Sequence, residues 1–192
     1  MPTFEELIAS LPVVSEDLVL LEGDHIPPIR RITSPNPRFV PLSFRDERAI
    51  TPEVTSVVLI TAPAAVGKST VASEIARRID APLLDLSLFQ VGHGFIEGTI
   101  MQAYGRRQGP DVLDAVDNGT AALIFDALDE GEVRAGSSNF EAFMIDLCAL
   151  CQTPRPRPTV IVLARGETAL LAELYLETQR GFLRLLCRGL FY

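Results

Sequence analysis

Residues 62–70 contain a lysine and a hydroxyl side chain at the spacing of a loop that holds phosphate groups. The run matches G-x-x-x-x-G-K-[ST] except at its first position, where alanine replaces glycine. Its members are Ala62, Pro63, Ala64, Ala65, Val66, Gly67, Lys68, Ser69 and Thr70. In such a loop the backbone N–H groups surround the phosphates, the lysine reaches the β- and γ-phosphates, and the hydroxyl joins the shell of Mg2+. We therefore expect a purine nucleoside triphosphate with Mg2+ at Lys68 and Ser69.

The sequence on either side of the loop supports this assignment. Residues 57–61 form a continuous apolar run with β-branched side chains, which is typical of a strand buried on both faces in a parallel sheet. Residues 68–79 carry apolar side chains at helical spacing, so an amphipathic helix should point its positive dipole end at the phosphates. Gly67 allows the close turn, and Ala62 needs a φ that a Cβ tolerates.

Acidic side chains follow a second buried strand. Residues 121–125 are apolar, and Asp126 comes next, where a carboxylate can hold Mg2+ through its water shell. Ser69 and Asp126 are therefore the expected metal ligands. Asp129 and Glu130 follow closely enough to orient or deprotonate an attacking water. The spacing leaves open which of the two does so, and the alternative for Glu130 is a solvated acidic turn.

An arginine follows a third apolar run, residues 159–164. The guanidinium of Arg165 can face the γ-phosphate and stabilise the charge that develops there. The alternative is that Arg165 only caps or solvates the end of the strand. The expected catalytic groups are Lys68, Asp129, Glu130 and Arg165.

Alternating strands and helices must position these side chains. Beyond the phosphate loop we expect strands at 82–86, 121–125 and 159–164, and helical segments at 95–104, 111–116, 140–151 and 168–177. This order predicts right-handed βαβ units and a ligand site at the carboxyl ends of parallel strands. The expected fold is an α/β, three-layer P-loop NTPase fold with a mainly parallel sheet flanked by helices.

Three segments are expected along the chain. Residues 1–50 combine a short helical pattern with several prolines, which predicts an irregular lead-in. Residues 51–180 should form the NTPase domain. Residues 181–192 are apolar and basic, and we expect a tail that is either a short packed helix or the product of a truncated or frameshifted gene. This tail is also the expected surface for a homo-oligomer or a protein partner.

Residues 62–70, taken with the run Asp126-Ala127-Leu128-Asp129-Glu130, resemble the NACHT-like branch of the STAND NTPases. The Walker B element of that family continues from an apolar strand into Asp, a small residue, an apolar residue, Asp and Glu. The strand that ends at Arg165 is similar to the family's sensor 1 position. The resemblance covers about residues 55–178 and implies an ATP-driven switch, often in signalling or defence. Members usually continue into a helical lid, a winged-helix segment and repeats, so we expect a truncated chain.

Composition and charge exclude several classes of protein. The formal net charge of -8 would repel a phosphate backbone, so nucleic acid is not an expected partner. No apolar run reaches the length of about 20 residues that spans a bilayer, and the amino terminus lacks the basic stretch of a signal peptide. The 3 cysteines cannot all pair, which indicates a reducing compartment. We expect a cytoplasmic protein that does not bind membranes.

The expected function is a slow, Mg-dependent ATPase that acts as a regulatory or defence-signalling switch. ATP is favoured over GTP because the chain has no Asn-Lys-x-Asp run. One alternative is a P-loop small-molecule kinase, in which Asp85, Arg106 and Arg107 would bind a second substrate, although the acidic run suits water activation better. The other alternative is a nucleotide-binding remnant or adaptor without turnover.

Overall fold

A single sheet runs through the centre of the molecule. The structure is a computed structural model that describes residues 3–19, 29–41, 43–46, 56–63, 66–151, 157–177 and 182–186. Within this part of the chain the strand order is β1-β4-β5-β6-β3-β7-β2. The inner strands are mutually parallel, and they are β3 (Val57–Thr61), β4 (Leu83–Asp85), β5 (Leu123–Asp126), β6 (Val160–Ala164) and β7 (Phe182–Leu186). The edge strands β1 (Ile29–Arg30) and β2 (Arg45–Asp46) run antiparallel to their neighbours.

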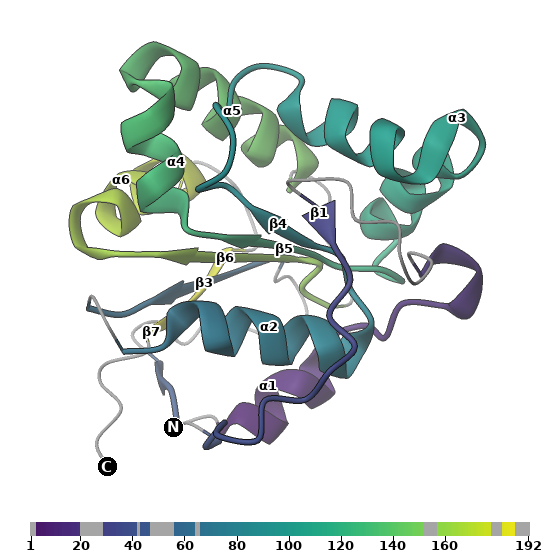
Figure 1. Cartoon of the computed structure of the whole chain (residues 1–192). Coiled ribbons are helices and arrows are strands. Elements are labelled where there is room, and N and C mark those ends of the chain that lie inside the picture. Colours follow the sequence, from purple (N-terminus) through teal and green to yellow (C-terminus); the bar gives the residue numbers. More distant parts are fainter. Residues whose placement is uncertain are drawn as a thin grey trace.

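Helices cover both faces of this sheet (Figure 1). On one face lie α1 (Phe4–Ser10) and α2 (Lys68–Ile79). A short 3-10 turn, η1 (Glu16–Leu18), follows α1 in the chain and contacts the helix α3 described next. On the other face lie α3 (Phe95–Asp117), α4 (Leu128–Ala135), α5 (Ser137–Leu150) and α6 (Gly166–Glu177). The α/β fold with a mostly parallel sheet between helices is therefore confirmed, and it is consistent with a P-loop NTPase-like fold.

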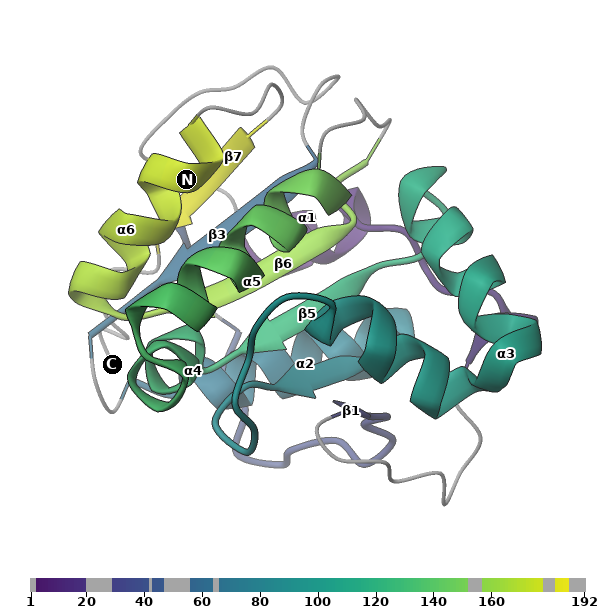
Figure 2. The same cartoon turned by 90° about the horizontal axis from the view of Figure 1, so that it is seen from above.

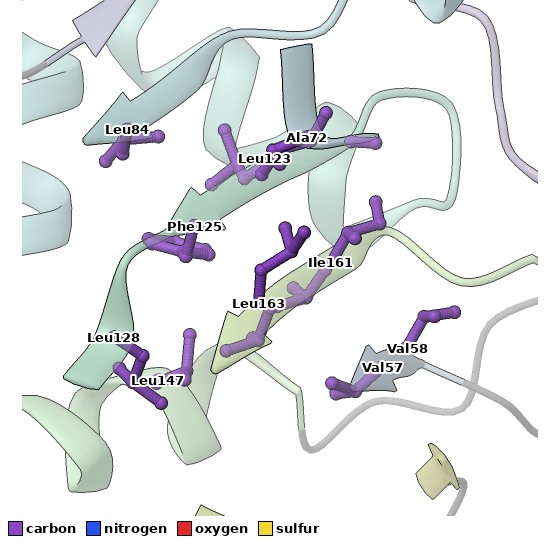
Figure 3. Close-up of a cluster of buried hydrophobic side chains, with 14 of the residues drawn as sticks. Val57, Val58, Ala72, Leu84, Leu123, Phe125, Leu128, Leu147, Ile161 and Leu163 are labelled. Atoms are coloured by element: carbon purple, nitrogen blue, oxygen red, sulfur yellow. The ribbon is translucent and has the colours of Figure 1, made fainter. Parts of the chain in front are cut away.

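The core lies between the inner strands and the covering helices. All residues of β3, β5 and β6 are buried, as expected for parallel strands with helices on both faces. Figure 3 shows Phe125 and Leu163 on neighbouring strands, with Leu128 and Leu147 of α4 and α5 nearby. The ring of Phe143 packs edge-on against Phe125, with their centroids 6.2 Å apart. This packing fixes the strand ends that carry the candidate site.

The carboxyl ends of four neighbouring strands meet at one edge of the sheet. Asp85 at the end of β4 is paired in register with Asp126 at the end of β5. Thr61 at the end of β3 is paired with Ala164 at the end of β6. The phosphate loop, the acidic run and Arg165 all follow these ends, so the topology brings the candidate site residues to the same edge.

The amino-terminal segment takes part in the sheet, which differs from the irregular lead-in that the sequence predicted. Helix α1 begins with a capping box, in which the Glu6 amide donates to Thr3 Oγ1 (3.2 Å) and the Thr3 amide donates to Glu6 Oε2 (2.7 Å). Strands β1 and β2 then border the sheet. Each has only two residues, so neither produces the periodic pattern by which a strand is recognised.

The carboxyl-terminal segment also differs from its prediction. Strand β7 extends the sheet beyond residue 181, where a separate tail was expected, and it pairs with the outer edge of β3. Without β7, the backbone N–H and C=O groups on this side of β3 would have no partner strand, and β7 supplies their hydrogen-bond partners. Residues 187–192 lie outside the described part of the chain.

Two helical regions depart from the expected boundaries. The segments predicted at 95–104 and 111–116 are joined in α3, which bends at Gly105 with a φ of 72°. The acidic run after β5 forms the helix α4, where the alternative was a turn. Its residues Leu128, Gly131 and Ala135 share one buried face, which explains why this short segment is helical.

No helix in the described residues has the length and apolar character needed to cross a membrane. The side chain of Cys148 lies in α5 and is buried. Burial raises the pKa of the Cys148 thiol to about 11, so this thiol stays protonated at neutral pH.

Candidate functional site

The phosphate loop joins the end of β3 to the start of α2. Gly67 is the N-cap residue of α2 and has φ 85° and ψ 27°, a left-handed conformation that glycine adopts without strain. Ala62 replaces the first glycine of the motif and is buried, and it is not among the described residues with positive φ. Its Cβ therefore causes no backbone strain. Ala64 and Ala65 lie outside the described residues.

Lys68 is the only lysine of the chain, and its side chain lies back over the start of the loop. The ammonium Nζ donates to the carbonyl oxygens of Ala62 (3.0 Å) and Pro63 (2.9 Å). It is thereby held beside the amino-terminal end of α2, where the helix dipole adds further positive potential. Phosphate oxygens are stronger acceptors than peptide carbonyls, so this lysine can exchange its carbonyl partners for a phosphate.

Ser69 and Asp126 come from different elements and meet at the edge of the sheet. Burial leaves only 3% of Asp126 exposed and raises the pKa of its carboxyl. The Ser69 hydroxyl and the Ala127 amide, which is 2.9 Å from Oδ1, oppose this shift by donating hydrogen bonds to the carboxyl. Ser69 is exposed, so the pair opens towards solvent.

The donor atoms of this pair fit Mg2+. A carboxylate and a hydroxyl are both oxygen ligands, and proteins that bind Mg2+ usually supply one or two such groups while waters and phosphate oxygens complete the octahedron. The Ser69 hydroxyl lowers the pKa of Asp126 against the larger effect of burial, so the two side chains lie near each other. Ser69 and Asp126 would therefore hold a metal ion together with the phosphates.

Ala127 turns the chain from β5 into α4. Its φ of 61° and ψ of 42° are left-handed, which costs a residue with a Cβ about 1 kcal/mol or more. The turn places Asp129 and Glu130 in the first turn of α4. The side chain of Asp129 is 14% exposed, and its Oδ1 has no hydrogen-bond partner in the described structure, whereas Glu130 is 51% exposed. Backbone strain of this kind often occurs at functional sites.

Arg165 forms ion pairs with both acidic residues of α4. Its Nε lies 2.9 Å from Asp129 Oδ2, and its Nη2 lies 3.2 Å from Glu130 Oε1. Strand β6 runs between β3 and β5, so Arg165 emerges between the phosphate loop and α4. The side chain is 45% exposed and does more than solvate the end of its strand. Glu130 likewise lies in helix α4 and forms an ion pair with Arg165, so it is not part of a solvated turn.

A second polar contact links α4 to α6. The Thr168 hydroxyl donates to Glu132 Oε2 at 2.5 Å, and Thr168 is buried. Sequence reasoning missed Thr168, because nothing local distinguishes it from other threonines at the start of a helix. Only the adjacency of β5 and β6 brings these two helices together.

The three residues of the kinase alternative do not form one cluster in the described structure. Asp85 Oδ1 accepts hydrogen bonds from the Ser87 amide (3.1 Å) and the Ser87 hydroxyl (2.5 Å). Its Oδ2 lies 3.9 Å from Nη2 of Arg30, which sequence reasoning also missed. Arg106 and Arg107 are exposed on α3, and neither pairs with Asp85 in the described structure. The carboxylate of Asp85 is thus used in fixing the loop after β4.

No protein-family model matches the chain. No curated protein matches it either. The solved structure of C. elegans PCH-2 is similar, with a TM-score of 0.33 and 14% sequence identity over 60% of this chain and 32% of that chain. The chain thus spans about a third of the PCH-2 chain, and a likeness at this level carries no functional argument.

Proposed function

We propose that this chain binds ATP with Mg2+ and hydrolyses it slowly, as a regulatory switch of the NACHT-like STAND type. The observation that carries the proposal is the meeting of Ser69 and Asp126 beside the loop that ends at Lys68. These residues come from segments far apart in the sequence, and they supply the phosphate and metal ligands that the motifs require.

Binding would use groups that already face the same edge of the sheet. The amides of residues 66–70 and the dipole of α2 would bind the phosphates, and Lys68 would exchange its carbonyl partners for the β- and γ-phosphate oxygens. Ser69 and Asp126 would hold Mg2+, which neutralises phosphate charge when bound. Asp126 must be ionised for this role; burial disfavours that form and raises the Asp126 pKa, whereas the Ser69 hydroxyl and a bound cation would favour it.

We assign proton abstraction from the attacking water to Glu130. Asp129 is mostly buried and its Oδ2 is held by the closer contact with Arg165, whereas Glu130 is half-exposed and can turn towards a water. A general base must come within hydrogen-bond distance of the proton that it removes. In this assignment Asp129 orients Arg165 and Glu130 acts on the water.

The ion pairs of Arg165 would make turnover slow and switch-like. While Nη2 of the guanidinium lies 3.2 Å from Glu130 Oε1, that oxygen is occupied and is not free to accept a proton from water. A γ-phosphate would compete for the same guanidinium and so release Glu130. The contact between Thr168 and Glu132 would transmit a shift of α4 to α6.

Calorimetry with Mg-ATP, together with phosphate release from the same samples, tests this function. We expect saturable binding by the wild type, no binding by Lys68→Ala, and binding without phosphate release by Glu130→Gln. Glu97→Gln is the matched control, because Glu97 is an exposed carboxylate on α3. It should leave both binding and release unchanged.

Two outcomes would contradict the proposal. Wild-type protein that binds Mg-ATP but releases no phosphate would favour the remnant or adaptor. Phosphate transfer to an added sugar or nucleoside, in place of release to water, would favour the kinase alternative.

A further inference from the structure

Helix α6 places its side chains in an unusual way. It buries Glu173, which is 6% exposed, while it exposes Leu170 (56%) and Leu174 (63%). Leu170 and Leu174 are one turn apart and therefore share one side of the helix. A helix that packs only against its own sheet would turn its leucines inward and its glutamate outward. The outer side of α6 thus has the character of a contact surface.

The neighbouring helix α5 also exposes a large apolar side chain. Helices α5 and α6 contact each other and lie side by side above the sheet in Figure 2. Ile145 of α5 is 57% exposed. Single exposed apolar residues are common, but several large ones on adjoining helices are typical of interaction sites. We call Ile145, Leu170 and Leu174 the α5–α6 surface.

The charges on these helices indicate what would cover the surface. Neither helix contains Lys, Arg or His, and their acidic residues are Glu141, Asp146, Glu167, Glu173 and Glu177. Glu167 lies one turn before Leu170, and Glu141 lies one turn before Ile145, and both are exposed. A second copy of this surface would bring like charges together, which opposes self-association. A basic partner has the complementary charge.

We propose that the α5–α6 surface docks a basic amphipathic helix of a partner protein. Leucine-type side chains of that helix would lie against Leu170, Leu174 and Ile145, and its lysines or arginines would face Glu141 and Glu167. This proposal goes beyond ATP hydrolysis and does not depend on it. The surface belongs to the helix that begins directly after Arg165, so partner and nucleotide would act on one element.

The test uses a defined probe and the full chain. The probe is a fluorescein-labelled peptide of leucine and lysine whose leucines recur at i, i+3, i+4 and i+7, with fluorescence anisotropy as the readout. A shuffled peptide of equal composition, in which the leucines do not share one face, measures binding by charge alone. We expect the amphipathic peptide to bind about tenfold or more tightly than the shuffled one.

Variants then locate the binding. Leu170→Ser combined with Leu174→Ser keeps the net charge and should weaken binding of the amphipathic peptide about tenfold or more. Val13→Ser combined with Val40→Ser removes two other exposed apolar side chains, at 62% and 58%, and should have no effect. Because all four residues are exposed, both variants should keep the wild-type circular dichroism spectrum, and the lower helix propensity of serine should cost the leucine variant at most about 1 kcal/mol in the free energy of unfolding.

Three results would overturn the proposal. The first is equal affinity of wild type and the leucine variant for the amphipathic peptide. The second is equal affinity of the wild type for the two peptides, which would mean that the peptide binds by its charge alone. The third is a wild-type dimer in analytical ultracentrifugation that the leucine variant dissociates, because the surface would then bind a second copy of the chain.

Discussion

Replacing Gly131 by alanine should push α4 away from Leu86 and slow hydrolysis. A Cβ at position 131 would lie 3.1 Å from the Cβ of Leu86 and 3.5 Å from its carbonyl oxygen. Leu86 is fully buried, so it cannot easily move aside. Overpacking of this kind costs about 1–3 kcal/mol, whereas alanine gains about 1 kcal/mol over glycine inside a helix. The free energy of unfolding should therefore fall by between zero and about 2 kcal/mol.

Gly98→Ala in α3 is the matched control, because a Cβ there would meet nothing within 4 Å. It should raise the free energy of unfolding, measured by urea titration, by about 0.5–1 kcal/mol. Phosphate release should fall several-fold only in Gly131→Ala, since α4 carries Asp129 and Glu130 and a misplacement of about 1 Å can cost a factor of about 100. Equal stabilisation by the two alanines would refute the close packing of α4 on Leu86.

Three further predictions concern the free energy of unfolding, measured by urea titration. Ala127→Gly should raise the free energy of unfolding by about 0.5–1 kcal/mol, because glycine adopts the left-handed conformation without strain. The control Ala142→Gly, within α5, should lower the free energy of unfolding by about 1 kcal/mol. If both variants are less stable than the wild type, Ala127 is not strained. Asp126→Asn should raise the free energy of unfolding by on the order of 1 kcal/mol at neutral pH, because burial raises the Asp126 pKa and disfavours the charged form. This gain should vanish as the pH falls towards the ordinary aspartate pKa of 3.8, and a pH-independent gain would contradict the reasoning. Glu74→Gln should lower it by about 1 kcal/mol, because the hydrogen bond from Arg77 holds the Glu74 pKa below its ordinary 4.5. The loss of unfolding free energy in Glu74→Gln should have its full size above pH 4.5 and should disappear as the pH falls through the folded-state pKa of Glu74. If the variant loses as much stability in acid as at neutral pH, the ion pair is not the cause.

Local patterns were sufficient for the elements around the phosphate loop. Helix α2 spans the predicted residues 68–79, and β3 spans the predicted residues 57–61. Both have a clear apolar period, and the motif fixes where the strand ends and the helix begins. The fold class followed from the alternation of such elements along the chain.

Elements defined by distant partners were not predictable in the same way. Strand β7 is recognisable only by its pairing with β3, more than a hundred residues earlier in the chain. Helix α4 did have a local signal, since Leu128, Gly131 and Ala135 follow helical spacing, but the sequence interpretation predicted no helix here and kept a solvated acidic turn as an alternative.

The site shows the same division. Ser69 and Asp126 could be paired from the motifs, because each motif implies the same metal ion. The ion pairs of Arg165 with Asp129 and Glu130 could not, because they depend on β6 lying beside β5 and on the left-handed turn at Ala127. Strand order is set by packing of the whole sheet and leaves no mark in the sequence near Arg165.

The most direct test of nucleotide binding uses the fact that Lys68 is the only lysine. Protein labelled with 13C and 15N in lysine alone gives a single lysine side-chain spin system in NMR spectra. We predict that Mg-ATP shifts the Lys68 Cε and Nζ signals saturably, and that Asp126→Asn removes the dependence of this shift on Mg2+. Lysine signals that stay unchanged at saturating Mg-ATP would contradict the central claim that this loop binds a nucleoside triphosphate.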